Sequence, residues 1–113
     1  MNQRDLINEI VATYQKHGWE LRRVLLLPER RAEVVNEDEL TFAGARVEDA
    51  SIDALWFSRP SFGKREAWEL RLIAETPYAL FETFEADGPD EGQEKLRHEM
   101  EARMAEHVTG KIL

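Results

Sequence analysis

The sequence predicts a single α+β domain over residues 1–113, in which two helices lie mainly on one face of an antiparallel sheet of four to five strands. Apolar residues recur at helical spacing near both ends of the chain and alternate with polar residues between them. In addition, Trp-Glu-Leu-Arg occurs twice, at residues 19–22 and 68–71. In a strand this pattern places Trp and Leu on one face and Glu and Arg on the other. The expected order is helix, two strands, long connection, three-strand meander and helix.

The first helix is expected over residues 3–17. Asn2 is a suitable N-cap, and an apolar stripe at helical spacing follows it. Gly18 stands where a left-handed residue commonly ends a helix, an arrangement that would bring Tyr14 and Trp19 into contact. The sequence therefore indicates both ends of this helix.

The segment after the first helix is typical of a strand over residues 19–27, which ends at Pro28. Residues 31–35 favour a second strand that returns as a hairpin partner. The alternative is a helical turn that opens at Pro28, since Glu, Arg and Ala favour helix, and the sequence leaves residues 30–36 open between the two. Residues 36–50 are expected to form a long connection.

Three antiparallel strands are expected at residues 51–59, 65–74 and 78–85, because short turns join them. A final helix begins at Pro89, which fits a first helical position, and ends at Gly110. The two Trp-Glu-Leu-Arg copies record either a duplicated hairpin or two strands that solve the same burial problem. The predicted core contains Trp19, Leu21, Leu25, Trp68, Leu70 and Leu72, and the residues predicted to face away from it are Glu20, Arg22, Glu69 and Arg71.

Composition and charge exclude several classes of function. The chain carries a formal charge of −8, from 23 acidic and 15 basic residues, and such a surface repels a phosphate backbone, so nucleic acid is not an expected partner. It has no cysteine, which excludes disulfides and thiolate chemistry. The first residues lack the pattern of a signal peptide, and no stretch reaches the roughly 20 apolar residues of a membrane span. We therefore expect a cytoplasmic protein without membrane contact.

No catalytic residue, metal site or cofactor is expected from the sequence. His98 and Glu99 begin like a zinc-protease motif, but Ala102 stands where the second histidine is needed. His107 lies about 180° from His98 around a helix, so the two cannot share a metal ion on one face. The serines lack a Gly-x-Ser-x-Gly frame, and the sequence leans against an enzyme.

The candidate ligand site is the turn between the first two strands of the meander. Arg59, Lys64 and Arg65 bracket this turn and place three cations in an otherwise acidic chain. Arginine and nearby backbone amides can hold a carboxylate or phosphate, and Trp56 and Trp68 would line an adjoining pocket beside the long connection. The alternative is a solvated turn whose basic residues discourage edge pairing.

For function, the sequence favours a non-catalytic module for protein interaction or self-association over a small-molecule binding protein or an enzyme. Trp56 and Phe57 are consecutive, so one strand has large apolar groups on both faces and a second face needs a cover. A homodimer, another protein or a folded-over segment would provide it. Only acidic charges lie between Arg71 and Lys95, and they would either steer a basic protein partner or keep the protein soluble.

Overall fold

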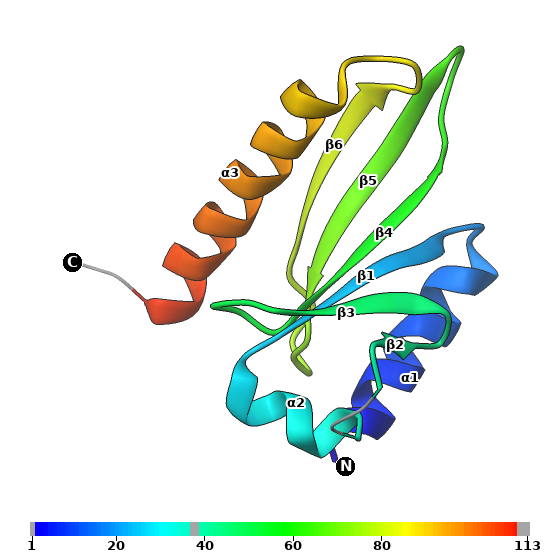
Figure 1. The fold of residues 1–113 in the computed structure, drawn as a ribbon. Helices are drawn as coiled ribbons and strands as arrows, with labels where there is room; N and C mark the ends of the chain where they lie inside the picture. Colours follow the sequence, from blue (N-terminus) through cyan, green and yellow to red (C-terminus); the bar gives the residue numbers. More distant parts are fainter. Residues whose placement is uncertain (1, 37–38, 111–113) are drawn as a thin grey trace.

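The computed structural model describes residues 2–36 and 39–110, and within them it contains three helices and a six-stranded sheet (Figure 1). This confirms the α+β class. Glu37 and Asp38 of the expected long connection lie outside the described residues. In chain order the elements are α1 (Gln3–Lys16), β1 (Glu20–Leu26), α2 (Pro28–Val34), β2 (Thr41–Phe42), β3 (Ala45–Asp49), β4 (Ala54–Pro60), β5 (Arg65–Leu72), β6 (Ala79–Glu85) and α3 (Asp90–Thr109).

The sheet has the strand order β2-β3-β1-β4-β5-β6 and is mixed. The meander of β4, β5 and β6 is antiparallel, as predicted. The expectation of a wholly antiparallel sheet is wrong, because β3 pairs with β1 in parallel. A parallel neighbour needs a crossover connection, and α2 provides it between these two strands. The sheet has six strands rather than four to five because the expected connection contains both β2 and β3.

Residues 28–34 form a helix, so the predicted returning strand is wrong and the helical alternative is the one observed. Pro28 occupies the first turn, where its fixed φ suits a helix and its missing N–H costs nothing. The helix ends with Val34 and Val35 buried in the core beside α1. Helix propensity and burial of the two valines therefore act in the same direction here.

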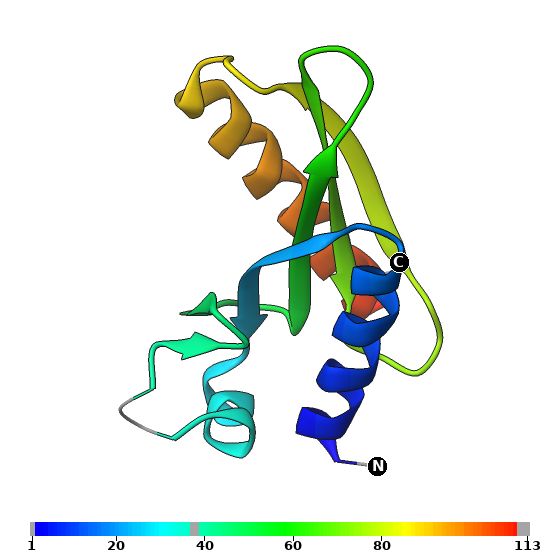
Figure 2. The same cartoon turned by 90° about the vertical axis from the view of Figure 1, so that its right-hand side faces the viewer.

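The helices lie on both faces of the sheet, which corrects the prediction that they share one face (Figures 1 and 2). Helices α1 and α2 cover what we call the α1 face, and α3 covers the opposite α3 face. The central strands are apolar on both sides: Phe57 lies in the core beneath α1, and its neighbour Trp56 lies in the core beneath α3. Such strands need cover on both faces, which one helical layer cannot supply.

The two Trp-Glu-Leu-Arg copies use opposite faces of the sheet. In the second copy, Trp68 packs under α3 while Glu69 accepts a hydrogen bond from Tyr14 of α1, so the predicted alternation is confirmed. In the first copy, Leu21 packs on the α1 face, and a β-bulge lies between it and Arg23. Two of the predicted core residues are only partly buried, namely Trp19 and Leu72.

The helix ends agree closely with the sequence. The side chain of Asn2 caps α1 by accepting the backbone N–H three residues later at 2.8 Å. Gly18 follows with a φ of 84°, a left-handed conformation that favours glycine, and the chain turns into Trp19. In α3, Pro89 is the N-cap rather than the first helical residue, and Gly110 ends the helix as predicted.

Candidate functional site

The three predicted cations flank or lie in the turn between β4 and β5, which projects at one end of the molecule (Figure 1), and the two arginines have different partners. The guanidinium of Arg59 donates to the carbonyl of His17 at 2.8 Å and lies 4.7 Å from the centre of the Trp19 ring. Arg65 donates to the hydroxyl and the carbonyl of Thr83 in β6, at 2.8 and 3.1 Å. Two of the three cations are therefore hydrogen-bonded within the protein.

Lys64 lines a surface hollow of about 460 Å³ together with Arg65, Glu85 and Asp87. An anion in this hollow would meet two carboxylates as well as two cations. The predicted site for a carboxylate or phosphate is therefore electrostatically balanced rather than basic.

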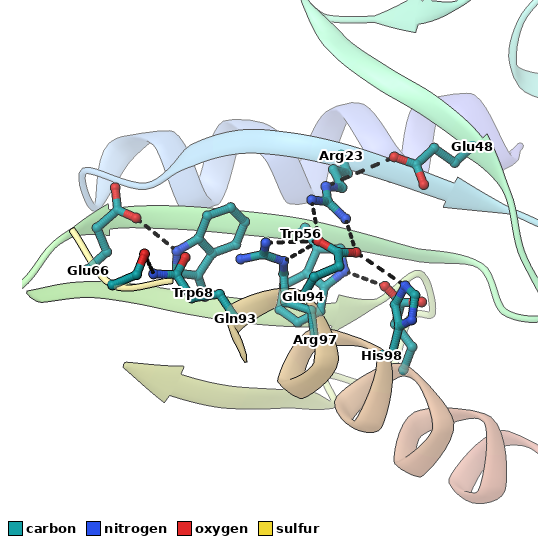
Figure 3. Close-up of polar contacts among 11 residues, drawn as sticks. Arg23, Glu48, Trp56, Glu66, Trp68, Gln93, Glu94, Arg97 and His98 are labelled. Atoms are coloured by element: carbon teal, nitrogen blue, oxygen red, sulfur yellow. Dashed lines mark hydrogen bonds and ion pairs between the residues drawn. The ribbon is translucent and has the colours of Figure 1, made fainter. Parts of the chain in front are cut away.

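The other two predicted site residues, Trp56 and Trp68, lie buried beneath α3 with their rings 5.9 Å apart. The indole N–H of Trp56 donates to Glu101 of α3 at 2.9 Å (Figure 3). Because Arg59 contacts the end of α1 on the opposite face, the structure does not bring the tryptophans and the cations into one pocket. Both indoles fill the core on the α3 face.

An ion-pair network joins α3 to the sheet (Figure 3). Glu94 of α3 accepts hydrogen bonds from Arg23 of β1 at 3.0 and 3.2 Å and from Arg97 at 2.9 Å. The hydrogen bonds from Arg23 lower the pKa of Glu94 to about 2, against the opposing effect of burial. The guanidinium of Arg97 is buried and lies 4.7 Å from the centre of the Trp68 ring. These contacts hold the helix in place.

Exposed aromatic side chains gather on the α1 face. Phe62 is 95% exposed and Phe81 is 55% exposed, and both line the same hollow of about 550 Å³. The edge of the Trp19 ring meets Phe81, with the ring centres 6.4 Å apart. We call this the aromatic hollow; its lining includes His17, Arg59, Pro60, Phe62, Ala67 and Phe81.

Phe62 and Phe81 were not among the site residues expected from the sequence. A phenylalanine in a four-residue turn was an available signal for Phe62, since a turn at a hairpin end offers little core to bury it. For Phe81 the alternation with Leu80 indicated opposite faces, but which face lacked a helix could not be read from the chain.

A second cavity, of about 470 Å³, lies along α1 on the same face of the sheet. A polar cluster stands beside it, in which the Tyr14 hydroxyl donates to Glu69 and the nearly buried Arg71 donates to the carbonyls of Leu72 and Ala74. Burial, together with the carboxylate, raises the pKa of Tyr14, so its hydroxyl remains a donor. We call this the α1 cavity; its lining includes Ile10, Thr13, Tyr14, Arg71, Glu75 and Pro77.

Comparisons of the chain with models of protein families, with curated proteins and with solved structures found no match. Across the described ranges 2–36 and 39–110, three His, Asp or Glu side chains nowhere come together in a way that could hold a metal ion. No helix in these same ranges is long and apolar enough to cross a membrane.

Proposed function

We propose that this protein is a non-catalytic protein-interaction module that binds its partner through the aromatic hollow. The observation that carries the proposal is the convergence of Phe62, 95% exposed, and Phe81, 55% exposed, on one hollow. A single exposed apolar residue is ordinary on a protein surface, but a cluster of aromatic groups in a concave site is typical of an interface. Trp19, which follows α1, and Arg59 of β4 contact each other and support the wall of the hollow.

Burial of both phenylalanines would stabilise a complex substantially. A phenylalanine that passes from water into a packed interface contributes about 1.5 to 3 kcal/mol. The end of α1 and the strands β4 and β5 contribute to the lining of the hollow, and these regular elements give it a firm base. A firm base reduces the ordering cost of binding.

A peptide-display selection on the folded protein tests the proposal. Peptides selected on the wild type are expected to lose binding to a Phe62→Ser/Phe81→Ser variant, since that variant removes the apolar contacts and leaves the fold intact. The matched control is Leu40→Ser/Val108→Ser, which removes two other exposed apolar side chains, 68% and 50% exposed. Selected peptides that bind the Phe62→Ser/Phe81→Ser variant as well as they bind the wild type would contradict the proposed site.

A second candidate function is the binding of a small anionic ligand in the α1 cavity. The favouring observation is Arg71, only 9% exposed, next to the Tyr14 hydroxyl in the lining of that cavity. A thermal-shift screen of small carboxylates and phosphates tests it, because a bound ligand raises the melting temperature by mass action. The expected lead compound also shifts the NMR signals of Thr13, which lines the cavity, and leaves Phe62 unchanged. A screen without any such shift argues against this function.

A further inference from the structure

The sheet ends on its two sides in very different strands. At one edge lies β2, which has two residues, and at the other lies β6, which has seven. An edge strand is a template for another chain, and proteins commonly protect it by shortness, proline or lysine. Strand β6, with the sequence Ala-Leu-Phe-Glu-Thr-Phe-Glu, has none of these protections.

The hydrogen bonds to β5 fix which backbone groups of β6 point outwards. Leu72 N–H donates to the carbonyl of Tyr78 at 3.0 Å, and Ala86 N–H donates to the carbonyl of Lys64 at 2.8 Å. In an antiparallel pair, alternate residues bond to the neighbour, so the even-numbered residues of β6 face β5. The backbone groups of Ala79, Phe81, Thr83 and Glu85 therefore face the open side.

One position of this edge is already covered by the protein itself. Arg65 donates to the carbonyl of Thr83, and the carboxylate of Glu82 accepts the Thr83 N–H at 3.4 Å. Both groups belong to flexible side chains that an incoming strand can displace. Arg65 therefore occupies this part of the edge when no partner is bound.

Phe81 connects this edge with the aromatic hollow. Its backbone groups face the open side of the sheet, and its side chain lines the hollow on the α1 face. A strand that paired with β6 would place alternate side chains on that face, directly beside Phe81. Backbone pairing and apolar contact are thus available to one and the same segment.

The charge along β6 determines the occupant. Glu82 and Glu85 lie in the strand, Glu75 and Asp87 stand beyond its ends, and the sequence has no basic residue between Arg71 and Lys95. A second copy of the chain, paired about the centre of β6, would bring Glu82 close to its own counterpart, and each copy carries a charge of −8. Like charges in cross-strand positions are destabilising, whereas a basic segment would form favourable pairs.

We propose that the edge of β6 accepts an extended basic segment of a partner protein as a seventh strand, with an apolar side chain of that segment beside Phe81. This rests on the proposed function, since Phe81 belongs to both surfaces. The main-chain hydrogen bonds supply affinity that is independent of sequence, while Phe81 and Glu82 select an apolar and a basic side chain. Arg65 leaves Thr83 when the segment binds.

Synthetic peptides of seven residues, the length of β6, provide the test. The probe alternates lysine with valine, one control replaces lysine by glutamate, and a second control keeps the lysines but carries N-methyl groups on alternate amides. The basic probe is expected to bind at least about tenfold more tightly than either control, and more weakly as salt is added. Hydrogen exchange of the Ala79 and Phe81 amides is expected to slow on binding, because the new strand occupies them.

Variants at and beside β6 separate the contributions of backbone pairing, of the Glu82 charge and of the Arg65 contact to binding. Ala79→Pro removes an N–H that points outwards and makes no hydrogen bond to β5. It should therefore weaken binding of the basic probe, while the control Ala79→Ser should not. Glu82→Gln should weaken the probe, whereas Glu106→Gln, at an exposed position in α3, should not. Arg65→Ala should strengthen binding by releasing Thr83, and it should do so more than Lys64→Ala, which removes the same charge without that contact.

Four outcomes overturn the proposal and leave the proposed function standing. Equal binding of the N-methylated peptide would mean attraction by charge alone. Peptides from the display selection that need Phe62 and Phe81 yet leave the Ala79 amide unprotected would mean binding in the hollow without strand addition. A concentration-dependent dimer in sedimentation, lost in Ala79→Pro, would make a second copy the occupant. Absence of binding by any basic probe, with Kd above about 1 mM, also overturns it.

Discussion

Each face of this sheet has a surface hollow beside the part that its helices cover, and the two hollows differ. On the α3 face, next to β1 and β3, lies a hollow of about 430 Å³ that we call the arginine hollow, lined by Arg22, Arg23, Arg46, Glu48 and Glu94. On the α1 face, next to β5 and β6, lies the aromatic hollow of about 550 Å³. The first brings opposite charges together, and the second presents exposed phenylalanines.

The contacts in the two hollows distinguish the surface that the fold requires from the one that it does not. Helix α1 packs mainly beside β1, and α3 packs mainly against β5 and β6, so the two hollows lie beside different helices. In the arginine hollow, Arg23 and Glu94 form a hydrogen-bonded ion pair that holds α3 to the sheet. In the aromatic hollow, Phe62 is 95% exposed and contributes little to the packing of this chain. The contacts of the first surface serve the fold, and the second surface is the one that we propose for binding.

The largest expected effect comes from Trp68→Ala, which removes a large side chain from the core between the sheet and α3. Trp68 is 6% exposed and lies between Trp56, Phe84 and Arg97. The substitution is expected to lower the free energy of unfolding by ~3 to 5 kcal/mol, measured by urea denaturation. A decrease in the free energy of unfolding of less than about 1 kcal/mol would contradict a major role of this core in stability.

Arg23→Ala is expected to have the next largest effect, because it leaves Glu94 without its main partner. A charge-assisted hydrogen bond contributes more than a neutral one, but partial exposure reduces it, so a loss of about 1 to 2 kcal/mol is expected. Arg46→Ala, which removes an exposed arginine from the same hollow, is the control. A double-mutant cycle of Arg23 with Glu94 should return a coupling of similar size; additive losses would contradict the structural role of the pair.

The same pair predicts a dependence of stability on pH. The pKa of Glu94 is lowered from 4.5 to about 2 in the folded protein, so its contribution is fully present above pH 4.5. It is lost as pH falls from 4.5 through 2, because the folded state must then give up the charge that Arg23 stabilises. Urea titrations across this pH range should show a smaller decrease in the free energy of unfolding for Glu94→Gln than for the wild type. If the free energy of unfolding fell equally with pH in both proteins, Glu94 would make no contribution to the loss of stability in acid.

The smallest effect on stability is expected for Phe62→Ser, at less than about 0.5 kcal/mol, since an exposed side chain loses little on truncation. The same change should reduce the fluorescence of a bound apolar dye, which reports exposed apolar surface. Leu40→Ser, 68% exposed and outside the aromatic hollow, is the matched control. Destabilisation by Phe62→Ser as large as that by Arg23→Ala would end the contrast between the two surfaces.

Local signals in the sequence determined much of this fold. Asn2 and Gly18 set the ends of α1, Gly110 ends α3, and short turns made β4, β5 and β6 antiparallel. These features depend on hydrogen bonds and backbone conformations within a few residues, so a local pattern is sufficient to predict them. The alternation of Trp68 and Glu69 is of the same kind, since it follows from strand geometry alone.

The candidate site was much less predictable. Arg59, Lys64 and Arg65 were correctly expected near one turn, but their partners at His17 and Thr83 are distant in sequence. Exposure of Phe81 depends on which strands the helices leave uncovered, and that is a property of the whole assembly.

The face of the sheet on which each segment packs depends on contacts between segments that are distant in sequence. The two Trp-Glu-Leu-Arg segments have the same local pattern, yet Leu21 packs under α1 and Leu70 packs under α3. Alternation sets which side chains share a face, but the face a helix covers depends on the route of the chain between strands. The parallel pairing of β1 with β3 likewise follows from α2, in which helix propensity and the burial of Val34 in a core assembled from distant segments act together.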